Sequence, residues 1–151
     1  AESDSLSAVT PRPSPDGRYL LSGVGSYGSF HVWHESGDIY LTDLETGITR
    51  PLDEINSPRA ESFKSWSSNS RWIAFTSRRD DGSYTRIYLA YFDLEGNAHK
   101  PFLLPQRDPD QNHRLFKSYN VPEFTTDKSS WTPKRIEMII HSDPHQATLI
   151  K

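Results

Sequence analysis

The sequence contains one unit of about 50 residues twice. The segment SPDGRYLLS, which begins at Ser14, is followed 53 positions later by SSNSRWIAF, which begins at Ser67. The tripeptide IYL occurs twice, 48 positions apart, and RPL is followed by KPF 50 positions later. Three matching blocks in the same order at nearly one spacing indicate an internal repeat, and loops of different length produce the small differences in spacing. The chain is therefore expected to form two copies of one small structure.

Each unit is predicted to form four short strands separated by turns. Ile39 and Leu41 alternate with polar neighbours, as in a half-buried strand, and Pro15-Asp16-Gly17 is a typical turn tripeptide. Residues 6–9, before Pro11, could add an inner strand to the first unit. Four strands in about 50 residues, repeated, are typical of the blades of a β-propeller. The expected strands cover residues 19–24, 30–34, 38–43 and 48–52 in the first unit, and 61–66, 72–77, 85–92 and 99–104 in the second.

The composition favours a folded chain and excludes several function classes. Hydrophobic residues make up 34% of the 151 residues, but the net charge is only −3, so disorder is not expected. A slightly acidic chain is not a nucleic-acid binder that acts through bulk charge, and no apolar run is long enough to insert into a membrane. There is no cysteine, which excludes disulfides and thiol chemistry. The first ten residues are polar and acidic, unlike a signal peptide, although a mature protein would have lost one.

The repeat ends after residue 104, and short helices are predicted beyond it. Asp108-Pro109 and Thr132-Pro133 each place a capping residue before a proline, which is typical of the first turn of a helix. They predict helices over DQNHRLF and over KRIEMIIH, the second with an apolar face. The prediction is thus an all-β chain with two four-stranded antiparallel propeller blades over 1–107, at about 6–57 and 58–107. A C-terminal extension over 108–151 is expected to pack on the blades or on a neighbouring domain.

The repeats resemble a known family. SPDGRYLL…DIYLTDLETG and SWSSNSRWIAFTSRRDDGSYTRIYLAYFDLEG are similar to the WD-like propeller repeat of TolB-type proteins, over residues 14–104. The second unit departs from the family pattern where Ser68-Asn69-Ser70 replaces Pro-Asp-Gly, but serine and asparagine can still form the turn. The segment after residue 99 also resembles the tail of large bacterial envelope-associated proteins that carry such a propeller.

The resemblance implies a non-enzymatic scaffold that binds a protein or a peptide in the bacterial periplasm or cell envelope. TolB-like propellers have about six blades and only two are readable here, so the missing blades are expected from a longer parent chain or from association of identical chains. Two enzymatic alternatives remain open. One is a metal-dependent oligosaccharide lyase, with His31 or His34 as ligands, and the other is the gating propeller of a prolyl-oligopeptidase-like hydrolase. The segment HQATLIK looks like a chain terminus, which counts against the second.

Candidate partner-binding residues lie in loops and on the expected inner strand of the second blade. The loop SRRDDGSYTR concentrates arginines, whose planar guanidinium groups bind carboxylates and phosphates with two bonds, but it could equally be an ordinary hairpin turn. Lys64, Ser65 or Trp66 could face the central channel, or Trp66 could pack between the blades. One histidine of HVWH could be buried and bonded to the backbone, while His34 could line a cleft. The candidates are His34, Trp66, Arg78, Arg79, Asp81 and Arg86.

No catalytic residue, metal site or cofactor is predicted. GVGSYG fits the glycine pattern of dinucleotide-binding loops, but no amphipathic helix follows it, so a hairpin loop is expected. The nucleophile-elbow pattern G-x-S-x-G is absent. His141, Asp143 and His145 in HSDPH could ligate a metal only with further ligands that the sequence does not offer nearby.

Overall fold

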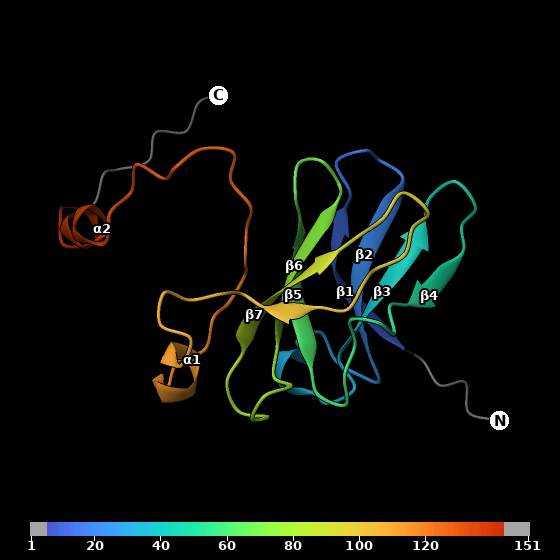
Figure 1. Ribbon diagram of the computed structural model, residues 1–151, viewed down its shortest axis with the longest axis horizontal. Helices are drawn as coiled ribbons and strands as arrows, with labels where there is room; N and C mark the ends of the chain where they lie inside the picture. The colour runs from blue at the N-terminus through green and yellow to red at the C-terminus, as the bar shows by residue number, and fades with distance from the viewer. Residues whose placement is uncertain (1–5, 144–151) are drawn as a thin grey trace.

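The computed structural model describes residues 6–143 and contains two four-stranded antiparallel sheets, as the repeat predicted (Figure 1). In each sheet the strands are neighbours in chain order, from the first to the last. The first sheet comprises β1 (Ser7–Pro13), β2 (Tyr19–Gly25), β3 (Asp38–Asp43) and β4 (Thr49–Pro51). The second comprises β5 (Glu61–Trp66), β6 (Trp72–Ser77), β7 (Arg86–Tyr91) and β8 (Phe102–Leu103). We call these sheets blade 1 and blade 2.

The predicted strand over 30–34 is wrong. This segment contains a single 3₁₀ turn, η1 (His31–Trp33), in which the N–H of His34 donates to the carbonyl of His31. A strand here could not pair with β2 or β3, its neighbours in the chain, because each of them is already paired on both edges. The inner strand that was expected from 6–9 is present and longer, as β1, so blade 1 still has four strands.

The turns that enter β2 and β6 confirm that the two blades are copies. In blade 1 the hydroxyl of Ser14 donates to Asp16 and accepts the N–H of Tyr19. In blade 2 Ser67 makes the same two bonds, with Asn69 and with the N–H of Trp72. The substitution in the second repeat is therefore tolerated, as predicted. Gly17 has a positive φ of 75°, and Ser70 takes the equivalent conformation at 57°.

The Ser70 side chain explains why the second turn carries serine at this strained position. Its hydroxyl is buried and accepts the backbone N–H of Asp16, in blade 1, at 3.1 Å. A glycine would relax the backbone but would leave that N–H without its partner. Sequence divergence at the turn thus adds a bond between the blades.

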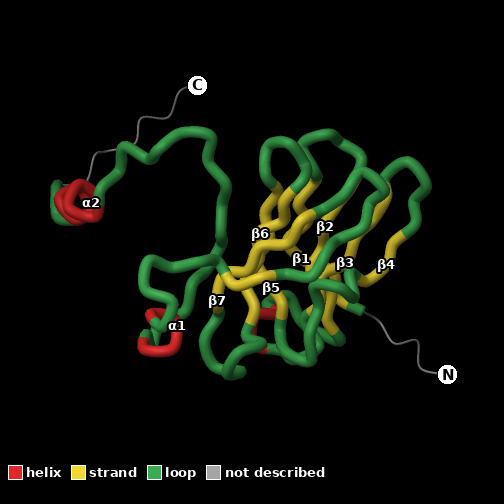
Figure 2. The backbone as a smooth tube through the Cα atoms, in the orientation of Figure 1, coloured by secondary structure: helices red, strands yellow, loops and turns green. Residues whose placement is uncertain are grey.

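The core lies between the two sheets, which stand side by side in Figure 2. Aromatic rings meet across the junction: Phe92 of blade 2 packs edge-on against Tyr19 of blade 1, with ring centroids 5.1 Å apart. The buried apolar residues are Tyr19, Leu21, Ile39, Leu41, Leu52 and Ile55 from the blade 1 side, and Trp66, Ile73, Phe75, Tyr88, Ala90, Phe92 and Ala98 from blade 2.

The segment that links the blades is hydrogen-bonded to blade 1 along its length. Asn56 forms two bonds with the backbone of Ile39, one accepted and one donated, at 2.9 and 3.1 Å. Where β5 begins, the N–H of Glu61 donates to the carbonyl of Gly37 at 2.7 Å. The link therefore holds the start of blade 2 against β3 and the loop before it.

The extension contains the two predicted helices, α1 (Gln111–Arg114) and α2 (Pro133–Ile140). Thr132 caps α2 as predicted, accepting the N–H of Arg135 at 3.3 Å. The stretch around α1 packs on blade 2, but α2 has no buried residue and lies apart from both sheets (Figure 1). The expectation that the extension packs on the blades thus holds for its first part alone. Among residues 6–143 no helix is both long and apolar enough to cross a membrane.

Candidate functional site

A pocket of about 190 Å³ opens where three segments far apart in the sequence meet. The loop that contains η1 comes from blade 1, the turn after β6 comes from blade 2, and the third segment belongs to the extension. We call it the arginine–tryptophan pocket. It is lined by Phe30, Val32, Trp33, Arg78, Thr85, Ser118 and Asn120.

Arg78 is the charged group of this pocket. It follows β6 directly, is only 7% exposed, and its guanidinium carbon lies 3.6 Å from the centroid of the Trp33 ring. One guanidinium nitrogen donates to the carbonyl of Ser83 at 2.7 Å, but the buried Nε–H has no partner among the described residues. Burial lowers the pKa of Arg78, and the Asp81 carboxylate opposes that shift. Because arginine stays protonated, the pocket is lined by a desolvated cation, which suits a carboxylate or carbonyl oxygen.

The far wall of the pocket is fixed by Thr85 and Arg86. The Thr85 hydroxyl donates to the carbonyl of Tyr119 at 2.5 Å, and the Thr85 carbonyl accepts the N–H of Tyr119 at 3.1 Å. The Arg86 guanidinium donates to the carbonyls of Asn112, Leu115 and Lys117. One buried arginine thus holds the first part of the extension on blade 2 and positions Ser118 and Asn120.

Of the residues predicted from the sequence, only Arg78 lines this pocket. Arg79 pairs instead with buried Glu61, and its guanidinium lies 4.6 Å from the Tyr88 ring centroid. Asp81 accepts two backbone N–H groups of its own turn. The His34 ring packs on Tyr27, with centroids 4.4 Å apart.

Trp66 packs between the blades, which was one of the two predicted alternatives. Its indole N–H donates to the carbonyl of Arg12, in blade 1, at 3.0 Å, and its ring meets Phe92 edge-on. Lys64 likewise bonds Thr10 of blade 1. Both side chains therefore belong to the junction between the blades.

Sequence reasoning missed Trp33, Phe30 and the two polar residues of the extension. Trp33 stands between the histidines of HVWH, and it is 63% exposed although it is a large apolar side chain. An aromatic residue in a glycine-bracketed loop was the available signal. The contact between Trp33 and Arg78 joins positions 45 apart, so the repeat alone does not reveal it.

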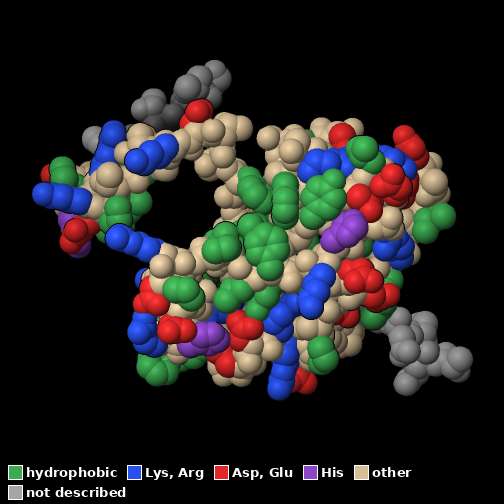
Figure 3. All heavy atoms as spheres, in the orientation of Figure 1, with side chains coloured by type: hydrophobic (Ala, Val, Ile, Leu, Met, Phe, Trp, Pro, Cys, Tyr) green, Lys and Arg blue, Asp and Glu red, His purple; other side chains and the backbone are tan. Residues whose placement is uncertain are grey.

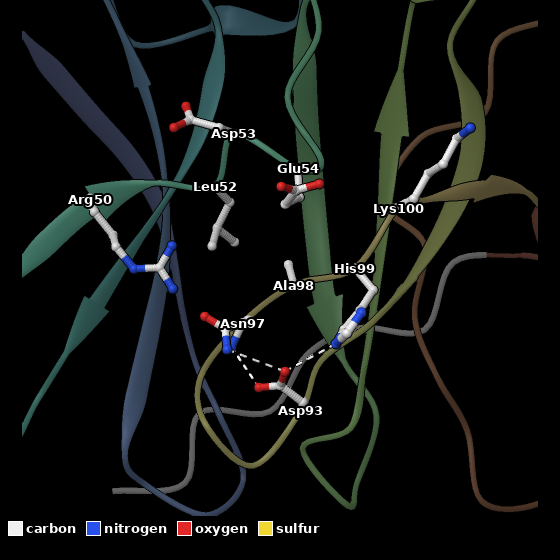
Figure 4. Close-up of a pocket in the computed structure, with 9 residues that line it drawn as sticks. All are labelled: Arg50, Leu52, Asp53, Glu54, Asp93, Asn97, Ala98, His99 and Lys100. Atoms are coloured by element: carbon white, nitrogen blue, oxygen red, sulfur yellow. Dashed lines mark hydrogen bonds and ion pairs between the residues drawn. The ribbon is translucent and has the colours of Figure 1, made fainter.

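A second, more polar pocket of about 490 Å³ lies at the rim between the end of β4 and the loop after β7 (Figure 4). Asp53 and Glu54 lie on one side of it, and Asp93 and Asn97 on the opposite side. Asp93 accepts from Nε2 of His99 at 3.0 Å and from the N–H of Asn97 at 2.7 Å. That N–H bond, supported by His99, holds the pKa of Asp93 below its usual value.

The rim pocket also carries a contact between the blades. Arg50, at the end of β4, donates to the carbonyl of Gly96, in blade 2, at 2.6 Å. Because Arg50 bonds the backbone of the other blade and Asp93 bonds His99 and Asn97, these residues of the pocket belong to the junction. The full lining is Arg50, Leu52, Asp53, Glu54, Asp93, Asn97, Ala98, His99 and Lys100.

The histidines of HVWH do not converge on a metal. His31 is buried and its Nε2 bonds the carbonyl of Gly28 at 3.0 Å, so the prediction of one backbone-bonded histidine is confirmed. Within residues 6–143 no three His, Asp or Glu side chains are grouped as a metal site would need. His145 of HSDPH lies outside the described residues.

No protein-family model matches this chain. No curated protein matches it either. Among solved structures it is similar to the β-propeller domain of the Trilobed protease from Pyrococcus furiosus, with 22% identity and a TM-score of 0.44, covering 66% of this chain and 30% of that one. It is also similar to a putative TolB from Agrobacterium tumefaciens, with 20% identity and a TM-score of 0.40, covering 66% and 31%. The chain thus spans less than a third of either structure. The two blades are evident in the chain's own sheets.

Proposed function

We propose that this chain provides two blades of a propeller scaffold, at about 6–57 and 58–107, that binds a protein or peptide without catalysing a reaction. In this proposal the arginine–tryptophan pocket receives a carboxylate of the partner, and the apolar part of the same residue or its neighbour packs on Trp33 and Phe30. The location in the periplasm or cell envelope is supported by the resemblance of the repeats to TolB-type proteins.

The observation that carries the proposal is the buried guanidinium of Arg78, which lies over the ring of exposed Trp33 in the lining of one pocket. Arginine and tryptophan are the residue types most enriched at the energetic centres of protein interfaces.

Replacing Arg78 by methionine should weaken binding of a carboxylate-bearing peptide at least about tenfold. Methionine preserves much of the apolar length but removes the charged hydrogen bonds, which contribute about 1.5–3 kcal/mol each. The probes are dye-labelled peptides that end in Leu-Asp or Phe-Glu with a free carboxylate, together with their fully amidated counterparts, and fluorescence polarisation is the readout.

Arg59→Met is the matched control, because Arg59 is half exposed and forms a surface ion pair with Glu35. It should change the affinity less than about twofold. Equal affinity of wild type and Arg78→Met, or equal affinity of the acidic and amidated peptides, would contradict the carboxylate site.

The outer face of blade 2 supports completion of a ring by further blades. Trp72 occupies the position that Tyr19 has in blade 1, and Phe102, which pairs with Leu89 as Arg50 pairs with Leu41, occupies that of Arg50. Tyr19 is buried against Phe92 of blade 2, and Arg50 donates to Gly96 of blade 2, but Phe102 is 44% exposed and packs with half-buried Trp72 on an uncovered surface. Figure 3 shows hydrophobic side chains gathered in the middle of this view of the molecule. A third blade of the same repeat would cover them.

If identical chains supply that blade, the protein should associate in solution, and light scattering coupled to size-exclusion chromatography should give a trimer for a six-bladed ring. Phe102→Glu places a charge on the uncovered face and should return the protein to a monomer. Leu94→Glu, at an exposed turn of the same blade, is the matched control and should leave the mass unchanged. A wild-type monomer at all concentrations would contradict self-association and assign the missing blades to a longer chain.

A further inference from the structure

The innermost strands, β1 and β5, contain a bulge at the same place in the repeat. The register of β1 against β2 shifts by one residue between Val9 and Arg12, and that of β5 against β6 shifts between Ser62 and Lys64. A bulge redirects the side chains that follow it. Here the bulge in β5 directs the Lys64 side chain toward β1.

Lys64 is a buried amine held by neutral oxygens. It is 3% exposed, and its Nζ donates to the hydroxyl of Thr10 at 2.7 Å and to the carbonyl of Val9 at 3.4 Å. Among the described residues it forms no ion pair with a carboxylate. Gly23 lies opposite, and a side chain there would begin only 3.0 Å from Nζ, so the glycine provides the space that the amine occupies.

Burial and a neighbouring positive charge favour the neutral form of the Lys64 amine. Burial, with a smaller effect from the positive charge of Arg12 on β1, lowers the pKa of Lys64 to about 7. The nearest acidic group on its own strand, Glu61, is already held by Arg79 and by the hydroxyls of Ser57 and Ser77. His31 faces the same space from η1 and keeps an unpaired Nδ1.

A small cavity lies at this amine. Its volume is about 30 Å³, and its lining includes Thr10, Gly23, His31 and Lys64. Space of this size holds about two water molecules. This volume suits a triatomic molecule.

We propose that Lys64 is a site of reversible carbamate formation, at which its amine binds carbon dioxide in this cavity. The lone pair of Nζ attacks the carbon of CO₂, an N–C bond forms, and one C=O bonding pair moves onto oxygen. The nitrogen then loses one proton to solvent, which leaves a carbamate with one negative charge. Arg12, whose charge disfavours the ammonium, favours this anion, and the Thr10 hydroxyl can donate to a carbamate oxygen.

The test uses the wild-type protein in ¹³C-labelled bicarbonate at pH 7.5, with carbamates trapped by ethylation with a trialkyloxonium salt and located by peptide mass spectrometry. The Lys64 peptide should carry the labelled ethoxycarbonyl group at least about tenfold more than the Lys100 peptide, because Lys100 is exposed to solvent and does not line this cavity. Both peptides come from one sample, so the comparison does not depend on the folding of a variant.

Two variants sharpen the result. Arg12→Gln removes the stabilising charge and should lower trapping at Lys64 severalfold while Lys100 is unchanged. Lys64→Arg has no nucleophilic amine at this position, so it should remove the carbamate signal of residue 64 from the ¹³C NMR spectrum of the folded protein. Trapping at Lys64 no greater than at Lys100, or a ¹³C signal that persists in Lys64→Arg, would overturn the proposal. Both outcomes are independent of peptide binding at Arg78.

Discussion

Replacing Phe92 by alanine is expected to lower the free energy of unfolding by about 3–5 kcal/mol, the usual cost of truncating a buried phenylalanine. Phe92 is fully buried, and its ring meets Tyr19 and Trp66 edge-on, with centroids 5.1 and 5.0 Å away. The truncation removes both aromatic contacts and leaves a cavity at the junction of the blades. Urea unfolding followed by far-ultraviolet circular dichroism gives the change.

The matched control is Leu94→Ala, in the turn directly after Phe92. Leu94 is 71% exposed, so its truncation should change stability by less than about 0.5 kcal/mol. A loss below about 1 kcal/mol for Phe92→Ala would show that the blades do not depend on this aromatic contact, contrary to the packing described above.

Replacing Glu61 by alanine is expected to cost about 3 kcal/mol or more, because it leaves a partly buried charge unpaired. The Glu61 carboxylate accepts from the Arg79 guanidinium at 3.0 Å and from the hydroxyls of Ser77 and Ser57 at 2.7 and 2.8 Å. Glu61→Gln keeps an acceptor for the serines and should cost less than Glu61→Ala. If urea unfolding gave the same loss of unfolding free energy for Glu61→Gln and Glu61→Ala, it would contradict a stabilising role for the bonds to the serines.

The same site gives a pH dependence with a definite sign. Burial raises the pKa of Glu61 despite its hydrogen bonds, and it raises the pKa of neighbouring Asp38 to about 6 with help from the charges of Glu61 and Asp53. Since the folded state binds these protons more tightly than the unfolded state, where carboxyl pKa values lie near 4, their contribution to stability is full in acid. It decreases as the pH rises from about 4 to above 6.

Glu61→Gln lacks the carboxyl group of Glu61, so part of the pH dependence of the unfolding free energy is removed. The difference in unfolding free energy between wild type and Glu61→Gln should therefore be largest near pH 4 and smaller at pH 7. A difference that instead grows with pH would show that the bonds to Arg79 and the serines, rather than burial, dominate the pKa of Glu61.

Most of the fold could be predicted because each strand carries its own local pattern. The strands over 61–66 and 72–77 were predicted to the residue, since polar turns and alternating or continuous apolar runs mark their ends. The 30–34 segment has the composition of a strand, but pairing is a property of the whole sheet, and β2 and β3, its neighbours in the chain, are already paired on both edges. Its conformation was therefore not encoded locally.

The candidate site was much less predictable. The arginine-rich turn was visible, and four of its charged residues were singled out, but which of them bond neighbours depends on packing. Arg79 forms an ion pair with Glu61, and Arg86 donates to backbone carbonyls. The Nε–H of Arg78 has no partner among the described residues. The pocket itself needs residues near 30, 80 and 120 to meet, and no repeat or spacing relates these three segments.

The short link between the blades, tied to β3 through Asn56 and to the loop before it through Glu61, couples the two sheets mechanically. If either sheet separates from the link, the backbone groups of Ile39 and Gly37 lose their hydrogen-bond partners, and the aromatic rings between the sheets become exposed. Amide protons in β3 and β5 should consequently exchange with solvent through one shared opening event, so that loosening either half loosens the whole.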